Sequence, residues 1–255
     1  MTASSVQAIR PNIDHWQERV DLACAFRWTA RLNMHEAVAN HFSLAVSDDS
    51  SKFLMNPNGR HFSRMRASEL LLLDAHDKST MDRPDAPDPT AWYLHGALHR
   101  EVPQARCILH VHSKYATALA ALADSTMPPI DQNTMRFYGR IAIDESFDGM
   151  GLGDEAERVA KLMKGSPDKS VLIMGNHGVM VFGSNVAIAF DELYYFERAC
   201  ETLITALSSG RPLRIASHEV AAKTAQQWLD YPGMGELHFA ECKAILDAED
   251  SDYRR

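Results

Sequence analysis

The alternation of apolar and polar residues predicts a series of helices and short strands in the first part of the chain. Apolar residues recur at spacings close to 3.6 over residues 14–35, which indicates an amphipathic helix. Two short β-like runs follow at 42–46 and 52–62, and the apolar run Leu70–Leu73 predicts a further buried strand. Residues 82–90 contain three prolines, and because proline has no N–H to donate, this segment is expected to be a loop.

The second part of the chain begins with a predicted helix at Trp92–Arg100. The strand CILHVHS follows at 107–113 and leads into an alanine-rich helix at Tyr115–Ala123. Residues 171–183, VLIMGNHGVMVFG, indicate two strands joined by a tight turn at Gly175–Gly178. Long periodic segments then predict three helices, at 185–207, 218–230 and 236–247.

Length and composition narrow the class of protein. A chain of 255 residues can bury a substantial core, and we expect residues 1–255 to form one domain. A net charge of −8 disfavours a nucleic-acid partner, because binding phosphates requires clustered Lys and Arg. No apolar run approaches the roughly 20 residues of a membrane span, and residues 1–12 show no secretory signal. We therefore expect a cytoplasmic protein whose four dispersed cysteines are reduced.

Histidines at the end of one strand and in a nearby turn suggest a metal site. On a β-strand, side chains two residues apart point to the same face, so His110 and His112 lie side by side while Leu109 and Val111 enter the core. His177 lies in the glycine-flanked turn GNHG. Catalytic divalent ions usually take three protein ligands and keep one position open, and these three imidazoles could supply them. From spacing alone, surface or core histidines remain the alternative.

Two longer segments carry a resemblance to a known family. The runs WYLHGALHREVPQARCILHVHSKYATALAALA (92–123) and VLIMGNHGVMVFGSNVAIAFDELYYFERAC (171–200) resemble the class II aldolase/adducin family, with a metal motif similar to that of fuculose-phosphate-type aldolases. The resemblance covers residues 15–210, with the helices of 217–247 beyond it. It implies an α/β fold, an α/β/α sandwich around a central, mostly antiparallel sheet, in a homotetramer with active sites near subunit boundaries. It also implies that the metal ligands are His110, His112 and His177.

The sequence departs from the family where those aldolases bind phosphate and move protons. The glutamate that the resemblance places four residues before the LH histidine is Ala91 here, and the preceding serines are Pro89 and Thr90. Of the family's GN-S loop only Asn40 and Ser43 remain, so Asn40 and Thr90 are the substrate-binding candidates that the resemblance leaves here. A sugar phosphate is therefore not the expected substrate.

Other polar residues are candidates for substrate binding. Asn58 and Gly59 could keep the backbone-amide part of an anion pocket. Gln132 replaces a family tyrosine in the stretch DQNTMRFYGR, which also contains Asn133 and Arg136 and could bind a substrate carboxylate or be a solvated loop.

The remaining histidines offer one acid–base candidate. Without the family glutamate, His95 is a candidate for proton transfer, with a buried, hydrogen-bonded histidine as the alternative. His95 and His99 lie four residues apart on a predicted helix and could form a second metal pair. His41, His61 and His76 are taken as ordinary surface or loop residues.

The resemblance implies a divalent-metal-dependent lyase acting on a small hydroxy- or oxo-acid, by aldol cleavage or decarboxylation through a metal-stabilised enediolate. Zn²⁺ is the favoured ion, with Mn²⁺, Ni²⁺, Co²⁺ or Fe²⁺ as alternatives. Two other hypotheses stay open: a non-heme iron oxygenase that uses the same three histidines, and a non-catalytic, adducin-like binding module. No nucleic-acid or membrane partner is expected.

Overall fold

A seven-stranded sheet forms the centre of the molecule. The computed structural model describes residues 13–147, 149, 154–231 and 233–255, and residues 1–12, over which we find no secretory signal, lie outside this range. The sheet order is β3-β2-β1-β4-β7-β6-β5, and only β5 and β6 pair in parallel, which confirms the expected mostly antiparallel sheet. The strands are β1 (His41–Ala45), β2 (Lys52–Met55), β3 (Leu71–Asp74), β4 (Cys107–Val111), β5 (Ile141–Asp144), β6 (Val171–Met174) and β7 (Gly178–Gly183).

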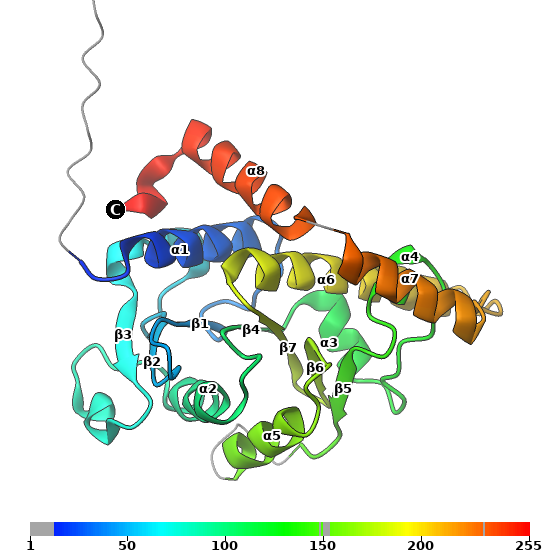
Figure 1. The fold of residues 1–255 in the computed structure, drawn as a ribbon, viewed down its shortest axis with the longest axis horizontal. Coiled ribbons are helices and arrows are strands. Elements are labelled where there is room, and N and C mark those ends of the chain that lie inside the picture. The colour runs from blue at the N-terminus through cyan, green and yellow to red at the C-terminus, as the bar shows by residue number, and fades with distance from the viewer. Residues whose placement is uncertain (1–12, 148, 150–153, 232) are drawn as a thin grey trace, which may run out of the picture.

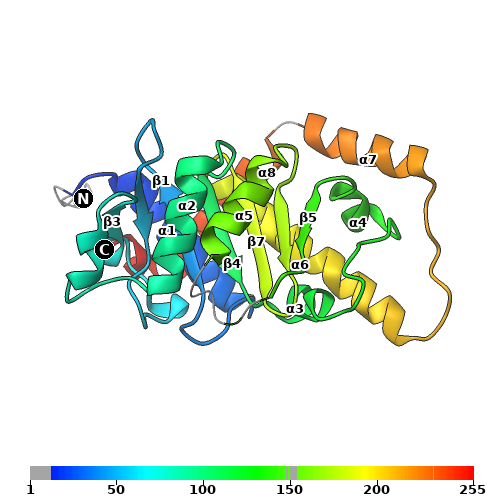
Figure 2. The ribbon, with the colours of Figure 1, turned by 90° about the horizontal axis from the view of Figure 1, so that it is seen from below.

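Helices cover both faces of this sheet, as expected of an α/β/α sandwich. Helices α1, α6 and α8 lie over one face and α2 and α5 over the other (Figure 1). Figure 2 shows α2 and α5 side by side, with α4 and α7 beyond the β5 end of the sheet. The helices are α1 (Trp16–Arg31), α2 (Pro89–Glu101), α3 (Lys114–Ala120), α4 (Gln132–Arg136), α5 (Glu155–Lys164), α6 (Val186–Ser208), α7 (His218–Asp230) and α8 (Met234–Glu249), with 3₁₀ turns at Phe62–Arg64, Ala67–Glu69, Lys78–Asp82 and Ser251–Arg254.

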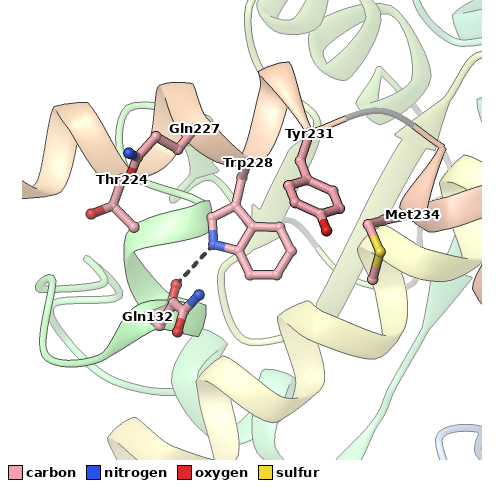
Figure 3. A pocket seen from close by; sticks show the side chains of 6 residues that line it. All are labelled: Gln132, Thr224, Gln227, Trp228, Tyr231 and Met234. Atoms are coloured by element: carbon pink, nitrogen blue, oxygen red, sulfur yellow. Dashed lines mark hydrogen bonds between the residues drawn. The ribbon is translucent and has the colours of Figure 1, made fainter.

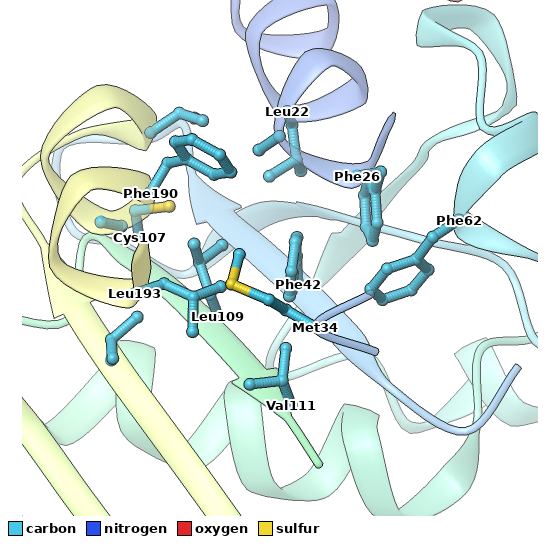
Figure 4. Packing of buried hydrophobic residues seen from close by; sticks show 14 of the residues in the cluster. Leu22, Phe26, Met34, Phe42, Phe62, Cys107, Leu109, Val111, Phe190 and Leu193 are labelled. Carbon is cyan, nitrogen blue, oxygen red and sulfur yellow. The ribbon is translucent and has the colours of Figure 1, made fainter. Parts of the chain in front are cut away.

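The largest hydrophobic core lies between the sheet and helices α1 and α6 (Figure 4). Phe26 of α1 stacks on Phe42 of β1 with ring centroids 4.6 Å apart, and Phe62 packs edge-on against Phe26. Leu109 and Val111 of β4 point into this core, as the alternating pattern predicts. The side chain of His110 therefore points to the opposite face, toward α2 and α5.

Two α-helices and one strand of the described residues were not predicted from the sequence, and neither were the short 3₁₀ turns. The stretch around Gln132 is not an open loop, because 132–136 form α4, whose N-terminus is capped by Asp131. Strand β5 and helix α5 were not predicted either. Strand β5 has only four residues, which is a short signal, whereas the ten residues of α5 carry an apolar helical spacing that was overlooked. None of the helices in the described part of the chain combines the length and apolar character needed to cross a lipid bilayer.

Candidate metal centre

Two neighbouring strands of the sheet bring three histidines together. His110 lies in β4 opposite Met180 of β7, and His112 follows the last residue of β4. His177 immediately precedes β7, in the turn from β6. Because β4 and β7 are antiparallel, the end of one and the start of the other meet at the same edge of the sheet. The three ring centroids are each 4.9 Å from the other two, and one potential ligand atom from each ring lies within 4.8 Å of the others.

Hydrogen bonds orient two of these rings. His110 Nδ1 is 3.1 Å from the carbonyl oxygen of Val179 and donates to it, and His112 Nδ1 is 2.7 Å from Glu36 Oε2. Their Nε2 atoms face each other at 3.0 Å. Metal-binding histidines commonly have their second nitrogen held in this way by a carbonyl or carboxylate.

The electrostatics of the three rings suit a divalent cation. Burial lowers the pKa of His110 well below its usual value, an effect that the neighbouring histidines reinforce. Burial, with His112 beside it, also lowers the pKa of His177 to about 4. These two imidazoles are therefore neutral near pH 7, which is the form that binds metal. The Nδ1 of His177 is buried without a hydrogen bond to the described residues. The donor set fits a three-histidine metal centre.

A cavity of about 380 Å³ opens directly over the three histidines. Two carboxylates line it: Asp88, just before α2, and Glu155, the first residue of α5. Glu155 Oε1 is 3.9 Å from His177 Nδ1. Burial raises the pKa of Glu155. The cavity is lined by Ala39, His41, Asp88, Thr90, Leu94, His110, His112, Phe147, Gly149, Glu155, Asn176 and His177.

Glu155 was not found from the sequence, although a signal for it existed. Residues 155–164, EAERVAKLMK, place Val159, Ala160 and Met163 on one buried face, a helical spacing that the sequence analysis did not use. An acidic residue at the start of such a helix is commonly a capping residue. Only the position of α5 beside α2 brings its carboxylate to the histidines.

His41 is also part of the cavity wall, so the expectation that it is an ordinary surface or loop residue was wrong. It lies in β1 and is 7% exposed, and its ring stacks on that of His110 with centroids 4.7 Å apart. Burial lowers the pKa of His41 to about 3. The apolar run FSLAV predicts a strand that begins at Phe42, one residue too late to include His41.

His95 lies one layer behind the cavity. It is fully buried, with its Nε2 2.7 Å from His41 Nδ1 and its Nδ1 2.5 Å from Ser43 Oγ. His99 uses both ring nitrogens as well, one with Ser43 Oγ and one with the carbonyl oxygen of Ala105. All four nitrogens of His95 and His99 are therefore engaged, and the pair has no nitrogen left for a second metal.

Asn40 and Thr90 lie at the edge of the centre. The Asn40 side-chain oxygen accepts hydrogen bonds from the backbone N–H groups of Glu36 and His112, and thus fixes the segment that holds His112. Thr90 lines the cavity, but its hydroxyl donates to Asp88 Oδ1 at 2.5 Å as part of the N-terminal cap of α2.

The other proposed substrate-binding residues lie outside this cavity. Asn58 and Gly59 line a separate surface hollow with Pro57 and the proline-rich loop, and Gly59 adopts φ +72°. Gln132 lies against α7, where its backbone oxygen accepts from Trp228 Nε1 at 3.3 Å (Figure 3). The hollow there is lined by Gln132, Thr224, Gln227, Trp228, Tyr231 and Met234.

Two further positions named in the sequence analysis are structural. Arg136 is buried and pairs with Asp191 and Glu192 of α6, so it is not a free cation for a substrate. Ala91 is fully buried in an apolar cluster with Phe53 and other residues of β2 and β3, and it is not part of the cavity wall.

Comparisons with known proteins agree with this architecture. A profile of the family described as Class II Aldolase and Adducin N-terminal domain matches residues 20–204. A Pseudomonas aeruginosa protein whose name places it among the class 2 aldolase proteins is 30% identical over 245 residues, covering 94% of this chain and 93% of that protein. The decarboxylase NovR of Streptomyces niveus is 26% identical over 227 residues, covering 86% and 82%. The crystal structure of an aldolase II superfamily protein from Pseudomonas syringae is similar with a TM-score of 0.84 and 30% identity, covering 96% and 99%.

Proposed function

Because the chain belongs to the class II aldolase and adducin family, we propose that it is a divalent-metal-dependent lyase acting on a small hydroxy- or oxo-acid. The observation that carries the proposal is the convergence of His110, His112 and His177 at the floor of a cavity that also holds two carboxylates. Zn²⁺ is the favoured ion, with Mn²⁺, Ni²⁺, Co²⁺ and Fe²⁺ as alternatives. An ion bound there would polarise the substrate oxygens and stabilise the negative charge left when a C–C bond breaks.

Residues of the chain supply the remaining chemistry. The Glu155 carboxyl faces the cavity near His177, and its raised pKa brings proton exchange closer to neutral pH. Glu155 therefore takes the proton-transferring role that Ala91 cannot fill. The mixed polar and apolar wall, which includes Leu94 and Phe147, would exclude water from a bound acid.

Three features bear on the reaction and the substrate. The similarity to a protein named as a decarboxylase favours decarboxylation over aldol cleavage. A sugar phosphate is disfavoured, because the Thr90 hydroxyl is already engaged by Asp88 and a second carboxylate would face the phosphate. The same three histidines would also hold Fe²⁺ for oxygen chemistry, so consumption of O₂ by the iron-loaded protein would distinguish an oxygenase from a lyase.

The presence of all three histidines favours an enzyme over an adducin-like binding module, because a module without catalysis would not need a metal centre. We further propose a homotetramer, as the family resemblance implies, and a cytoplasmic location, as expected from the sequence, with a small molecule as the partner of this site. No helix in the described ranges is long and apolar enough to span a membrane, and the net charge of −8 disfavours a nucleic-acid partner.

Metal analysis followed by a substrate panel tests the proposal. Purified protein should contain about one divalent ion per chain, and the His110→Ala/His112→Ala variant should contain none. His76→Ala is the matched control, because His76 is exposed and makes no side-chain hydrogen bond to the described residues. The protein should then release CO₂ or an aldehyde from a member of a panel of 2-oxo and 2-hydroxy acids. Full metal content in the double variant would place the metal elsewhere, and a metal-loaded protein inactive across the panel would contradict the lyase assignment.

A further inference from the structure

A chain of four hydrogen-bonded side chains runs from the protein interior to the cavity wall. It starts at the carbonyl oxygen of Ala105, which is 2.7 Å from His99 Nδ1. His99 Nε2 is 2.7 Å from Ser43 Oγ, which is 2.5 Å from His95 Nδ1. His95 Nε2 is 2.7 Å from His41 Nδ1. The four side chains come from β1 and α2, and the chain ends at His41, beside the metal centre.

The backbone carbonyl gives this chain a single direction. Ala105 can only accept, so His99 Nδ1 carries a proton and, in a neutral ring, His99 Nε2 is the acceptor. Ser43 must then donate its hydroxyl proton to His99 and accept from His95 Nδ1–H. His95 Nε2 is in turn an acceptor, and His41 Nδ1–H donates to it. Each step leaves one consistent tautomer, with His41 protonated on Nδ1 and bare on Nε2.

Burial keeps the rings neutral, which the argument requires. His95 is 0% exposed, His99 2% and His41 7%, and no carboxylate makes a hydrogen bond to any of the three among the described residues. A positive charge on a ring in such surroundings would be costly, because no hydrogen-bonded anion compensates for the lost hydration and Asp88 offsets only part of that cost at His41. A second proton on His95 would also set its Nε2–H against His41 Nδ1–H, whereas His41 is kept neutral by its burial alone, because its Nε2 has no hydrogen-bond partner among the described residues.

His41 Nε2 makes no hydrogen bond to the described residues, and the His41 ring lines the cavity while stacking on His110. We propose that the Ala105–His99–Ser43–His95 chain locks His41 in the Nδ1–H tautomer, so that His41 Nε2 accepts a hydrogen bond from the hydroxyl group of a substrate held beside the metal. His95 is then a positioning residue, and His41 is the residue that selects a hydroxyl donor.

This inference rests on the proposed function for the location of the substrate, and it adds a preference. A hydroxy-acid such as glycolate has an O–H to donate to His41 Nε2. Oxalate can bind a metal through two oxygens in the same way, but it has only acceptor oxygens. One of these would face the lone pair of His41 Nε2 without forming a hydrogen bond. The site should therefore favour the hydroxy-acid through His41, and this preference is separable from metal binding.

The tautomer can be measured without metal or substrate. In protein labelled with ¹⁵N-histidine, long-range ¹H–¹⁵N correlation spectra distinguish protonated from bare ring nitrogens, and His41→Phe assigns the His41 signals. We expect a protonated Nδ1 and a bare Nε2 in His41, and a mixture of tautomers in Ser43→Ala, which removes the link to the carbonyl. A protonated His41 Nε2 in the wild-type protein would overturn the proposal, whether or not Ser43→Ala folds.

Ligand binding tests the recognition step. Calorimetric titration of zinc-loaded protein with glycolate should show roughly tenfold weaker binding in His41→Phe, which keeps a stacked ring but loses the acceptor, while oxalate affinity is unchanged or improves. His76→Phe is the control for an added aromatic ring. Equal weakening for both ligands, or no change for glycolate, would overturn the role of His41. Wild-type protein that binds zinc but not glycolate would contradict the recognition of the hydroxyl group by His41. Wild-type protein that binds no zinc would contradict the proposed function as well. In that case the ¹⁵N spectra would still show which nitrogen of His41 is protonated.

Discussion

Replacing Gly178 by alanine should damage the metal centre through a steric contact alone. Gly178 follows His177 and opens strand β7. A Cβ built at this position would lie 2.7 Å from Cδ2 of His112 and 2.7 Å from the carbonyl oxygen of Val111. Ordinary carbon contacts need about 3.5–4.0 Å, so the His112 ring or strand β4 must move by about 1 Å.

The expected losses of zinc affinity and of stability follow from the groups that the new methyl group displaces. A shift of His112 breaks either its bond to Glu36 or its alignment with the other two rings, and losses of this kind typically reduce metal affinity roughly 10–100-fold. Overpacking between β4 and β7 should also cost about 1–3 kcal/mol of unfolding free energy. Zinc affinity is measured by competition with a chromogenic chelator, and stability by urea unfolding of the metal-free protein.

Gly165→Ala is the matched control for this prediction. Gly165 ends α5 with φ −76°, and an added Cβ would find its nearest neighbours at 3.5 and 3.6 Å, which is ordinary contact. The control should keep both zinc affinity and stability. Gly178→Ala protein with unchanged zinc affinity would show that His112 does not hold the metal in the observed position.

Three further predictions concern the surroundings of the site. Arg136→Met should lower the unfolding free energy by roughly 3–5 kcal/mol in urea titrations, because it leaves the buried Asp191 and Glu192 without their shared partner. The hydrogen bond to Asp191 raises the pKa of His238 to about 9. The stabilisation from charged His238 is therefore complete below pH about 6.5 and is lost as pH rises through 9. In unfolding titrations, the difference in unfolding free energy between the wild-type protein and His238→Gln should shrink by about 1–3 kcal/mol between pH 6 and 10. Ala91→Glu should lower the melting temperature by several degrees without adding a metal ligand, because position 91 is fully buried among apolar side chains; unchanged stability with tighter zinc binding would contradict this.

The central strands and the grouping of the three histidines could be predicted from the sequence, because the patterns that indicate them are local. Alternation in CILHVHS decides which side chains of β4 share a face, and the turn GNHG is short enough to place His177 at the start of β7. The pairing of β4 with β7 was accessible only through the family resemblance, since no local pattern specifies which strands become neighbours. The long helix at 185–207 agrees closely with α6, whose periodic apolar face packs in the main core.

Residues that reach the site from distant elements could not be found in this way. Glu155 and Asp88 come from the N-terminal ends of α5 and α2, where an acidic residue has an ordinary capping explanation. His41 faces His110 only because β1 pairs with β4 in the register that sets these two residues opposite each other. A one-residue slip would turn His41 into the other face, so its role depends on tertiary register rather than on composition.

The antiparallel pairing of β4 with β7 also sets the time at which a metal can first be held during synthesis. His112 and His177 are separated by about 65 residues of chain, and at roughly 5–20 residues per second the ribosome needs about 3–13 s to pass from one to the other. Until β7 is made, β4 has an unpaired edge and offers only two imidazoles, which is one ligand short of the centre. If the three histidines hold a metal as proposed, an ion captured at that stage would be exchangeable, and selection of the resident ion would belong to the last steps of folding, when the third histidine completes the site.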